Sequence, residues 1–504
     1  MEDARVPPFL FLARCLRETN LQESNVDAKP WTRVATPASP HRRERATSNS
    51  PSPRKNCQHF AMSKKPSSPP MGPTPTPSFL VKKIKSNFVT ASCAGTRFGN
   101  TTKMSLRIIF QILFYLHLLL TAATVIFITV YGLTTESGGQ HFHPLKWYPP
   151  VLASTACGGI IGFMWQWITF SYPRNALKAA FWLGPLLTCL MAGMFVYMGT
   201  ATSLIVGLVS FCSALAQSLY GCWVSHRFEY ATNILSVSTA FPPAKTRVLV
   251  LATIVIGTLY CCFLVSGIGG ATALQDKFKL AFIFILVIML SLGWTMQFLK
   301  NVIQLTISRV TYLQILGNHM DTCAALRDSI NRSGGCIAIG SILIPVFTLF
   351  RSFGRLMSLL GGEDEILFCC VMVLVNVLPQ FVNRWSFVHI GAYNKEFVHA
   401  SRDTWEMFNS SRMLPLIDSD LTGALCFLSG VAVGAFCSMT LITLFMDTDY
   451  GTDVLMQCRL AMGWLQACVA AYYVAYGENP ESDQFDSTIP ARLEQIQGSQ
   501  ALLN

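Results

Sequence analysis

Five side chains between residues 294 and 308 follow the spacing of a single helical face. They are Trp294, Gln297, Asn301, Gln304 and Ser308, at intervals of three, four, three and four. The surrounding stretch is apolar, so this polar face must contact protein or water rather than lipid. Two interpretations are open: the face lines a cavity, or its amides join neighbouring helices. The position of Trp294 beside the amides slightly favours a cavity.

A face of this type can bind a quaternary ammonium ion without a carboxylate, because aromatic rings attract such cations by about 0.5–2 kcal/mol each. We therefore expect Trp294, Gln297 and Asn301 to line a substrate path. Other aromatic residues at a comparable depth complete the predicted substrate-binding set: Trp165, Trp464 and Tyr260. Any one of these aromatics is more often a packing residue than part of a cage.

Motifs for other chemistry are missing from the sequence. There is no GxxxxGK[ST] phosphate loop, no HExxH and no GxSxG. His117 stands alone in an apolar stretch, where a packing histidine is the simpler interpretation. The 17 cysteines form no CxxC pattern. The sequence therefore predicts no catalytic residue, no metal site and no cofactor, and the protein is not expected to be an enzyme.

The elements that carry these residues are read from hydropathy. Only 13% of the 504 residues are charged and 51% are hydrophobic, whereas soluble proteins carry about 25% charged residues. Continuous apolar stretches of about 20 residues predict membrane-spanning helices. Ten are expected: 108–133, 149–170, 178–198, 201–224, 248–271, 280–304, 334–352, 366–382, 421–445 and 454–476. The fold class is an all-α polytopic membrane protein.

Charge inside these spans is sparse. None contains Asp or Glu, and Lys300 and Arg459 are the main cations within them. Snorkelling to the membrane surface is the preferred interpretation of both. The fifth span ends in a glycine-rich run at 266–270, which predicts either a broken helix or an outer loop.

The formal net charge of +11 might indicate nucleic acid, but it is confined to one end. Up to residue 107 there are 18 basic and 6 acidic side chains, which leaves 20 basic and 21 acidic ones in the rest of the chain. No nucleic-acid partner is therefore expected. Residues 1–103 hold 13 of the 25 prolines and no apolar period, which predicts a disordered basic tail.

Lysine and arginine in the short loops set the expected orientation. With the basic tail inside, the inner loops and adjoining span ends hold twelve such residues and the outer ones five, among them Arg351 and Arg355. Both termini are thus expected in the cytoplasm. The predicted organisation is a tail at 1–103, a ten-helix transporter domain at 104–477 and a short cytoplasmic C-terminal tail at 478–504. The lipid bilayer is the expected surrounding.

Several long strings resemble the choline-transporter-like family, and especially its plant branch. They are 223–232 (WVSHRFEYAT), 294–309 (WTMQFLKNVIQLTISR), 383–393 (NRWSFVHIGAY), 141–149 (HFHPLKWYP) and 485–492 (FDSTIPAR). The resemblance covers nearly all of 105–495. It implies about ten spans, cytoplasmic termini and facilitated or exchange-type movement of choline or a related amine. The first outer loop departs from animal members, because it is short and lacks cysteine.

The predicted function is thus a transmembrane transporter of choline or a related quaternary amine. The plasma membrane is the expected location, with an endomembrane as the alternative. Two other functions remain open: a non-transporting membrane organiser that affects lipid homeostasis or trafficking, and a passive channel.

Overall fold

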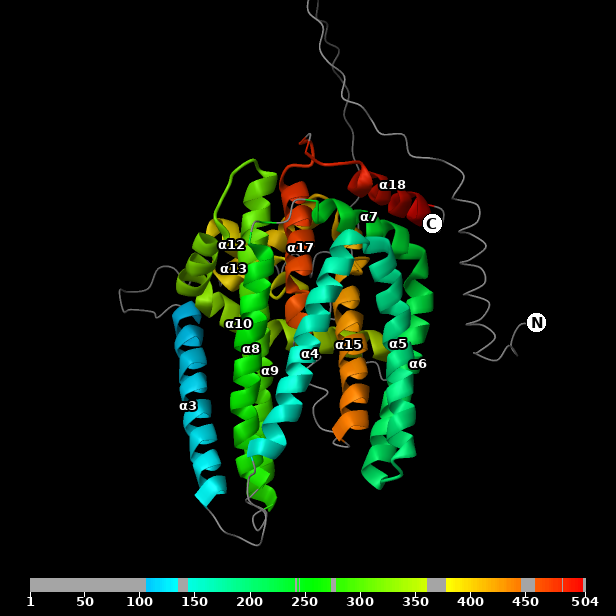
Figure 1. Ribbon diagram of the computed structural model, residues 1–504. Coiled ribbons are helices and arrows are strands. Elements are labelled where there is room, and N and C mark those ends of the chain that lie inside the picture. The colour runs from blue at the N-terminus through cyan, green and yellow to red at the C-terminus, as the bar shows by residue number, and fades with distance from the viewer. Residues whose placement is uncertain are drawn as a thin grey trace, which may run out of the picture. The chain divides into compact units, whose positions relative to one another are not determined.

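The computed structural model describes residues 106–134, 144–272 (except 241, 242 and 244), 278–359, 378–445 and 458–501 (except 483). The predicted tail at 1–103 and most of the eighth predicted span, 366–382, lie outside these ranges. Every regular element in the described part is helical (Figure 1). The predicted all-α fold class is confirmed.

Long helices form the body. They are α3 (Leu106–Thr134), α4 (Pro144–Ser171), α5 (Pro173–Tyr197), α6 (Ala201–Val224), α8 (Thr246–Thr272), α9 (Phe278–Ile315), α10 (Thr322–Leu359), α15 (Thr422–Phe445) and α17 (Gly463–Glu478). Shorter helices connect them: η1 (Ser225–Arg227), α7 (Phe228–Ser238), η3 (Leu378–Gln380), α12 (Ser386–Tyr393), α13 (Phe397–Ser410), α14 (Leu414–Asp418) and α18 (Thr488–Ala501).

Local sequence signals account for several boundaries. Thr200 begins α6 with a capping box, in which its hydroxyl accepts from the Ser203 backbone N–H at 3.2 Å. Pro173 occupies the first turn of α5, where its missing N–H is no loss. Asn394 ends α12 in the left-handed conformation that asparagine tolerates. These capping residues therefore mark helix boundaries that hydropathy alone does not show.

Seven of the helices have the length and apolar composition needed to cross a membrane. They correspond to predicted spans one, three to seven and nine. Predicted spans two and ten coincide with α4 and α17, which are not among these seven, and α17 has only 16 residues. The protein is an integral membrane protein, and the number ten stays a prediction.

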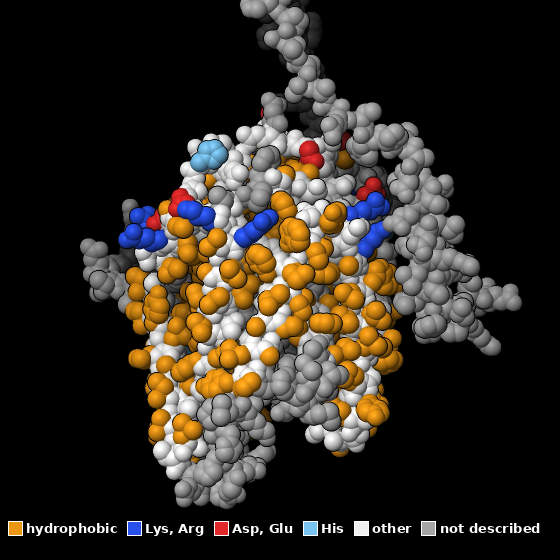
Figure 2. Space-filling view, in the orientation of Figure 1, with side chains coloured by type: hydrophobic (Ala, Val, Ile, Leu, Met, Phe, Trp, Pro, Cys, Tyr) orange, Lys and Arg blue, Asp and Glu red, His pale blue; other side chains and the backbone are white. Residues whose placement is uncertain are grey.

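The surface agrees with a lipid-facing bundle. Figure 2 shows hydrophobic side chains over the long helices, while Lys, Arg, Asp and Glu gather toward one end. At that end Arg107, near the start of α3, donates to the Asn394 side chain at 3.3 Å. Helix α18 packs against α7 and α14 (Figure 1). The first and last described helices thus meet loops that were predicted on the same, inner side.

Helix α9 is the central element of the bundle. It packs along α17, α10, α8 and α12, and more briefly against α3. Residues 300–308 are all buried. The helix runs past the predicted end at 304 to Ile315, as the sequence allowed. The faces of α9 therefore contact different neighbours along the length of the helix.

The glycine-rich run of the fifth span neither breaks the helix nor forms a loop, because α8 continues to Thr272. Its glycines instead allow α8 to cross α3 closely. A Cβ added at Gly270 would lie 2.5 Å from the Ile128 backbone oxygen, and one at Gly132 would lie 2.7 Å from the Gly270 Cα. Two glycines facing each other thus set the α3–α8 distance.

One pair of loop assignments is wrong. The sequence placed Arg351 in an outer loop and 383–420 on the inner side. The Arg351 guanidinium instead lies 2.5 Å from the Asp418 carboxylate, at the end of α14. The two residues therefore lie at the same depth in the helical bundle, so the two assignments cannot both hold. Loop charge alone missed this contact because it counts positive residues and not the carboxylates that attract them.

Candidate functional site

The polar stripe on α9 makes hydrogen bonds to neighbouring elements. Gln297 donates to the Asn301 Oδ1 at 3.3 Å, and Asn301 donates to the Ser341 hydroxyl of α10 at 2.9 Å. Gln304 donates to the Arg384 backbone oxygen at 3.3 Å. The predicted single face is thus present. In this conformation its amides join helices, which was one of the two interpretations of the stripe.

Trp294 lies one turn from these amides, against α3. Its ring centroid is 4.5 Å from that of His117 and 5.5 Å from that of Phe114, and Phe114 stacks on Phe298 at 4.0 Å. The Trp294 Nε1 and the His117 Nδ1 are both buried without a hydrogen-bond partner. His117, read as a packing residue, therefore belongs to an aromatic group with two open polar positions.

Tyr260 sits at a different face of α9. Its hydroxyl lies 2.7 Å from the Ser291 hydroxyl and accepts from the Thr295 hydroxyl at 3.2 Å. These bonds join α8 to α9 among a small cluster of buried apolar residues that includes Cys261 and Leu292. The Tyr260 hydroxyl is thus already hydrogen-bonded across the contact between α8 and α9.

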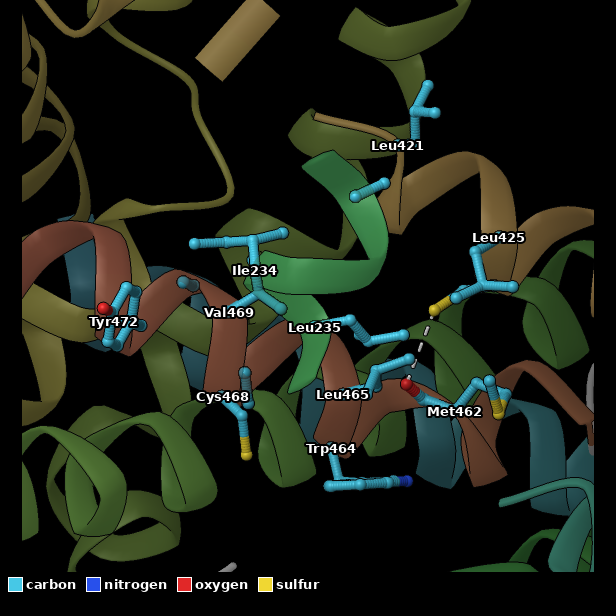
Figure 3. Close-up of a cluster of buried hydrophobic side chains, with 14 of the residues drawn as sticks. Ile234, Leu235, Leu421, Leu425, Met462, Trp464, Leu465, Cys468, Val469 and Tyr472 are labelled. Carbon is cyan, nitrogen blue, oxygen red and sulfur yellow. Dashed lines mark hydrogen bonds between the residues drawn. The ribbon is translucent and has the colours of Figure 1, made fainter. Parts of the chain in front are cut away.

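Trp165 and Trp464 belong to the largest hydrophobic cluster of the described residues. Trp165, on α4, donates its Nε1 to the Ser429 hydroxyl of α15 at 2.9 Å. Trp464 is only 2% exposed, and its Nε1 has no hydrogen-bond partner. Figure 3 shows it beside Leu465 and Cys468, on the α17 turn that follows Met462. Hydrophobic packing therefore dominates both positions.

The six predicted substrate-binding residues consequently lie in three places. Trp294, Gln297 and Asn301 follow one side of α9, Tyr260 joins α8 to α9, and the other two pack in the main core. The structure brings the first three together, while the proposed secondary walls contribute to helix packing.

Sequence reasoning missed a polar network at the charged end. The Glu478 carboxylate, at the end of α17, lies 3.0 Å from the His389 Nε2 and accepts from the Tyr312 and Tyr393 hydroxyls. The two tyrosine hydroxyls are 2.8 Å apart, and the Thr404 hydroxyl is 3.2 Å from the His389 Nδ1. The network ties α9, α12, α13 and α17 together. Tyr312 lies four residues after Ser308, so extension of the stripe would have found it.

The environment of Glu478 makes the stability of the folded protein depend on pH. Desolvation raises the pKa of Glu478, but the hydrogen bonds from His389 and Tyr312 outweigh it and hold that pKa below its ordinary value of 4.5. A carboxyl whose pKa is lowered by folding stabilises the folded state above its unfolded pKa. That contribution is lost as pH falls through the lowered value.

We expect Glu478→Gln to lower the melting temperature of the purified protein, because the network loses its charged acceptor. The difference from wild type should be largest above pH 4.5 and should shrink as the pH is lowered further. Melting curves across this range, with Glu406→Gln on the exposed face of α13 as the control, measure it. A difference that does not change with pH would exclude the ionised carboxylate as the cause.

Charged residues also meet inside the bundle. Arg384 pairs with Asp420, which is 1% exposed, and its guanidinium lies 4.5 Å from the Trp385 ring centroid. Lys300 is 8% exposed, and its stem packs over Gly463 of α17. The snorkelling interpretation is therefore wrong for Lys300, because its side chain is enclosed within the protein beside α17.

The profile of the family described as plasma-membrane choline transporter matches residues 200–478, more than half of the chain. This region contains α9, the polar stripe, the Glu478 network and the Arg384–Asp420 pair. The chain belongs to the plasma-membrane choline transporter family. It is thus a membrane protein of the choline-transporter-like type, and its family is one of transporters.

Curated relatives agree with this membership. Protein PNS1 of Gibberella zeae is 29% identical over 174 residues, which is 32% of each chain. A CTL-like protein of Dictyostelium discoideum is 20% identical over 302 residues, 55% of this chain and 52% of the relative. Protein PNS1 of Saccharomyces cerevisiae is 25% identical over 198 residues, 34% of this chain and 36% of the relative. The alignments thus span about a third to a half of these relatives' lengths.

Proposed function

We propose that this protein carries choline or a related quaternary amine across a membrane, by facilitated or exchange-type transport. The family match over 200–478 is the observation that carries the proposal. The gradient of the amine and the membrane potential supply the driving force. The name of the family favours the plasma membrane as the location, and imaging of a fluorescent fusion beside plasma-membrane and endomembrane markers tests it.

The stripe and its aromatic neighbours are the proposed path. Trp294 and Phe114 present aromatic faces between α3 and α9, and Gln297 and Asn301 follow along the same helix. A quaternary ammonium ion donates no hydrogen bond, so ring faces and amide oxygens are suitable partners for it. Movement of α3 away from α9 would open this position.

The Glu478 network is the proposed inner closure. It fastens the inner ends of α9, α12 and α17 through one carboxylate. Alternating access requires one end of a carrier to close while the other opens. Opening toward the cytoplasm therefore requires these hydrogen bonds to break, and their loss in Glu478→Gln should also change the uptake rate.

Trp294→Ala tests the path. Vesicles that contain the purified protein should take up labelled choline, and loss of the largest aromatic face should weaken apparent affinity by about tenfold. Trp167→Ala is the matched control, because Trp167 is 61% exposed on α4 and lies outside the path. Unchanged rate and affinity in Trp294→Ala would assign the stripe to packing alone.

The same vesicles separate the other functions. Saturable uptake supports a carrier, whereas a flux that rises without saturation identifies a passive channel. Wild-type protein that shows no uptake of choline, ethanolamine or larger quaternary amines would favour a membrane organiser. A chain without residues 1–100 should retain uptake, since the proposed path lies entirely in the helical domain.

A further inference from the structure

Three cations converge where α9, α15 and α17 meet. Lys300 comes from α9, Arg384 precedes α12, and Arg459 lies in the helical segment just before α17. Lys300 is within electrostatic range of both arginines. We call these three residues the cation cluster. Asp420, paired with Arg384, is the only carboxylate bonded to any of them within the described part of the chain.

Two of the cations pack against glycines, and the contact is tight at Gly423. A Cβ added at Gly463 would lie 3.4 Å from the Lys300 Cγ, and a Cβ added at Gly423 would lie 2.5 Å from the Arg384 Nη1. Cys426, one turn after Gly423, donates from its Sγ to the Met462 backbone oxygen at 3.6 Å. This contact joins α15 to α17 beside the cluster and appears as the dashed line in Figure 3. The helix surfaces therefore accommodate the charges within the bundle.

Two of these cations have no counter-charge. Asp420 pairs with Arg384, but neither Lys300 nor Arg459 forms a hydrogen bond or an ion pair with another residue in the described ranges. A buried charge without a partner is costly and marks a functional position in membrane proteins. Such charges would also repel a cationic substrate, by roughly 2 kcal/mol each at 8 Å and an effective dielectric constant of 20.

A bound anion would supply the missing counter-charge and would also reduce the repulsion of a cationic substrate. Its charge would offset Lys300 and Arg459, and a phosphate or carboxylate oxygen accepts from ammonium and guanidinium groups. We propose that the cation cluster binds an anionic group, a phosphate or a carboxylate, inside the transporter. This inference rests on the proposed function, because it adds an anionic component to the transport of a quaternary amine.

The anionic group has two possible sources. It is either part of the substrate, which is then a zwitterion with a quaternary amine at one end, or a separate anion that moves with choline. Both sources require the same residues. Trp464 follows Gly463 on α17, and its Nε1 is a further buried donor without a partner. It lies next in sequence to Gly463, which the Lys300 stem contacts.

Binding to the full-length protein in lipid nanodiscs, at constant ionic strength, tests the site. The probes are inorganic phosphate, choline and phosphocholine, and the readouts are direct binding and the shift of the melting temperature. Wild type should bind phosphate or phosphocholine. Lys300→Met should weaken that binding about tenfold or more, since a charge-assisted contact is lost. Arg459→Gln should act in the same direction and provides the test should Lys300→Met not fold.

The outcomes separate the two sources. Phosphate that binds alone and raises the affinity for choline identifies a separate anion, whereas binding of phosphocholine only identifies a zwitterionic substrate. Arg327→Gln, an exposed cation on α10, is the control and should leave anion binding unchanged.

Two results would overturn the proposal: equal anion binding in wild type, Lys300→Met and Arg459→Gln, or no anion binding in wild type. Choline uptake that persists alongside either result would leave the proposed function intact. Anion binding without uptake of choline, phosphocholine or larger quaternary amines would contradict the proposed function instead.

Discussion

Gly270→Val is expected to prevent the protein from folding into a monodisperse species. The added side chain would collide with the backbone of α3, because a Cβ at this position already lies 2.5 Å from the Ile128 oxygen. Backbone atoms cannot rotate away, so the two helices must separate along the crossing. Overpacking commonly costs about 1–3 kcal/mol, and contact with backbone places this site at the upper end or beyond. Size-exclusion profiles and melting temperatures in detergent measure the effect.

Gly293→Ala is the matched control. Gly293 also lies inside a long helix, α9, but a Cβ there would meet nothing within 4 Å. Alanine favours a helix over glycine by roughly 0.5–1 kcal/mol, so this variant should melt at or above the wild-type temperature. If both variants behave alike, the α3–α8 crossing does not depend on glycine.

Asp420→Asn should destabilise the protein by about 2–4 kcal/mol, because it leaves the half-buried Arg384 guanidinium without its counter-charge. The substitution keeps the shape of the side chain. It also keeps the oxygen that accepts from the Thr422 backbone N–H at the start of α15. The substitution therefore removes the charge and the oxygen that accepts from Arg384, and little else. Unfolding by heat or denaturant in detergent measures it.

Asp321→Asn separates this charge effect from helix capping. Asp321 accepts from the Cys323 backbone N–H at the start of α10, as Asp420 does for α15, and it also pairs with a cation, Lys245. Asp321 is 51% exposed, so water compensates for the lost charge and little change is expected. Equal losses in the two variants would attribute the effect to capping.

The sequence predicts the structure best where it depends on a local property of the chain, such as hydropathy or helical period. Predicted span 201–224 coincides with α6, and Trp294, Gln297 and Asn301 lie along one side of α9 as their spacing indicated. Hydropathy and helical period are local properties, so they can be read without knowledge of the neighbours. The partners of the stripe are not local: Ser341 and Arg384 are 40 and 80 residues away from the amides that they contact.

The two incorrect predictions, for α13 and for Lys300, have physical explanations. Helix α13 was taken for a loop, because its apolar residues occupy one face only and its mean hydropathy is low. The buried set Phe397, Ala400, Thr404 and Phe408 follows the helical period, which a search for spans does not test. Lys300 was assigned to the membrane surface, because the helix that covers its stem, at Gly463, lies 163 residues later in the chain.

The two nitrogens that lack partners, on Trp294 and His117, have an energetic consequence for ligand binding. Each such buried atom has given up its hydrogen bond to water and gained none in return, at a cost of about 1–3 kcal/mol. A water molecule, or a hydroxyl group of a ligand, that hydrogen-bonds to either atom would recover part of this free energy. Every 1.4 kcal/mol recovered amounts to a tenfold gain in affinity. The aromatic contact between α3 and α9 therefore includes the cost of two unpaired nitrogens. A substrate that enters there and hydrogen-bonds to one of them would remove part of this cost and bind more tightly.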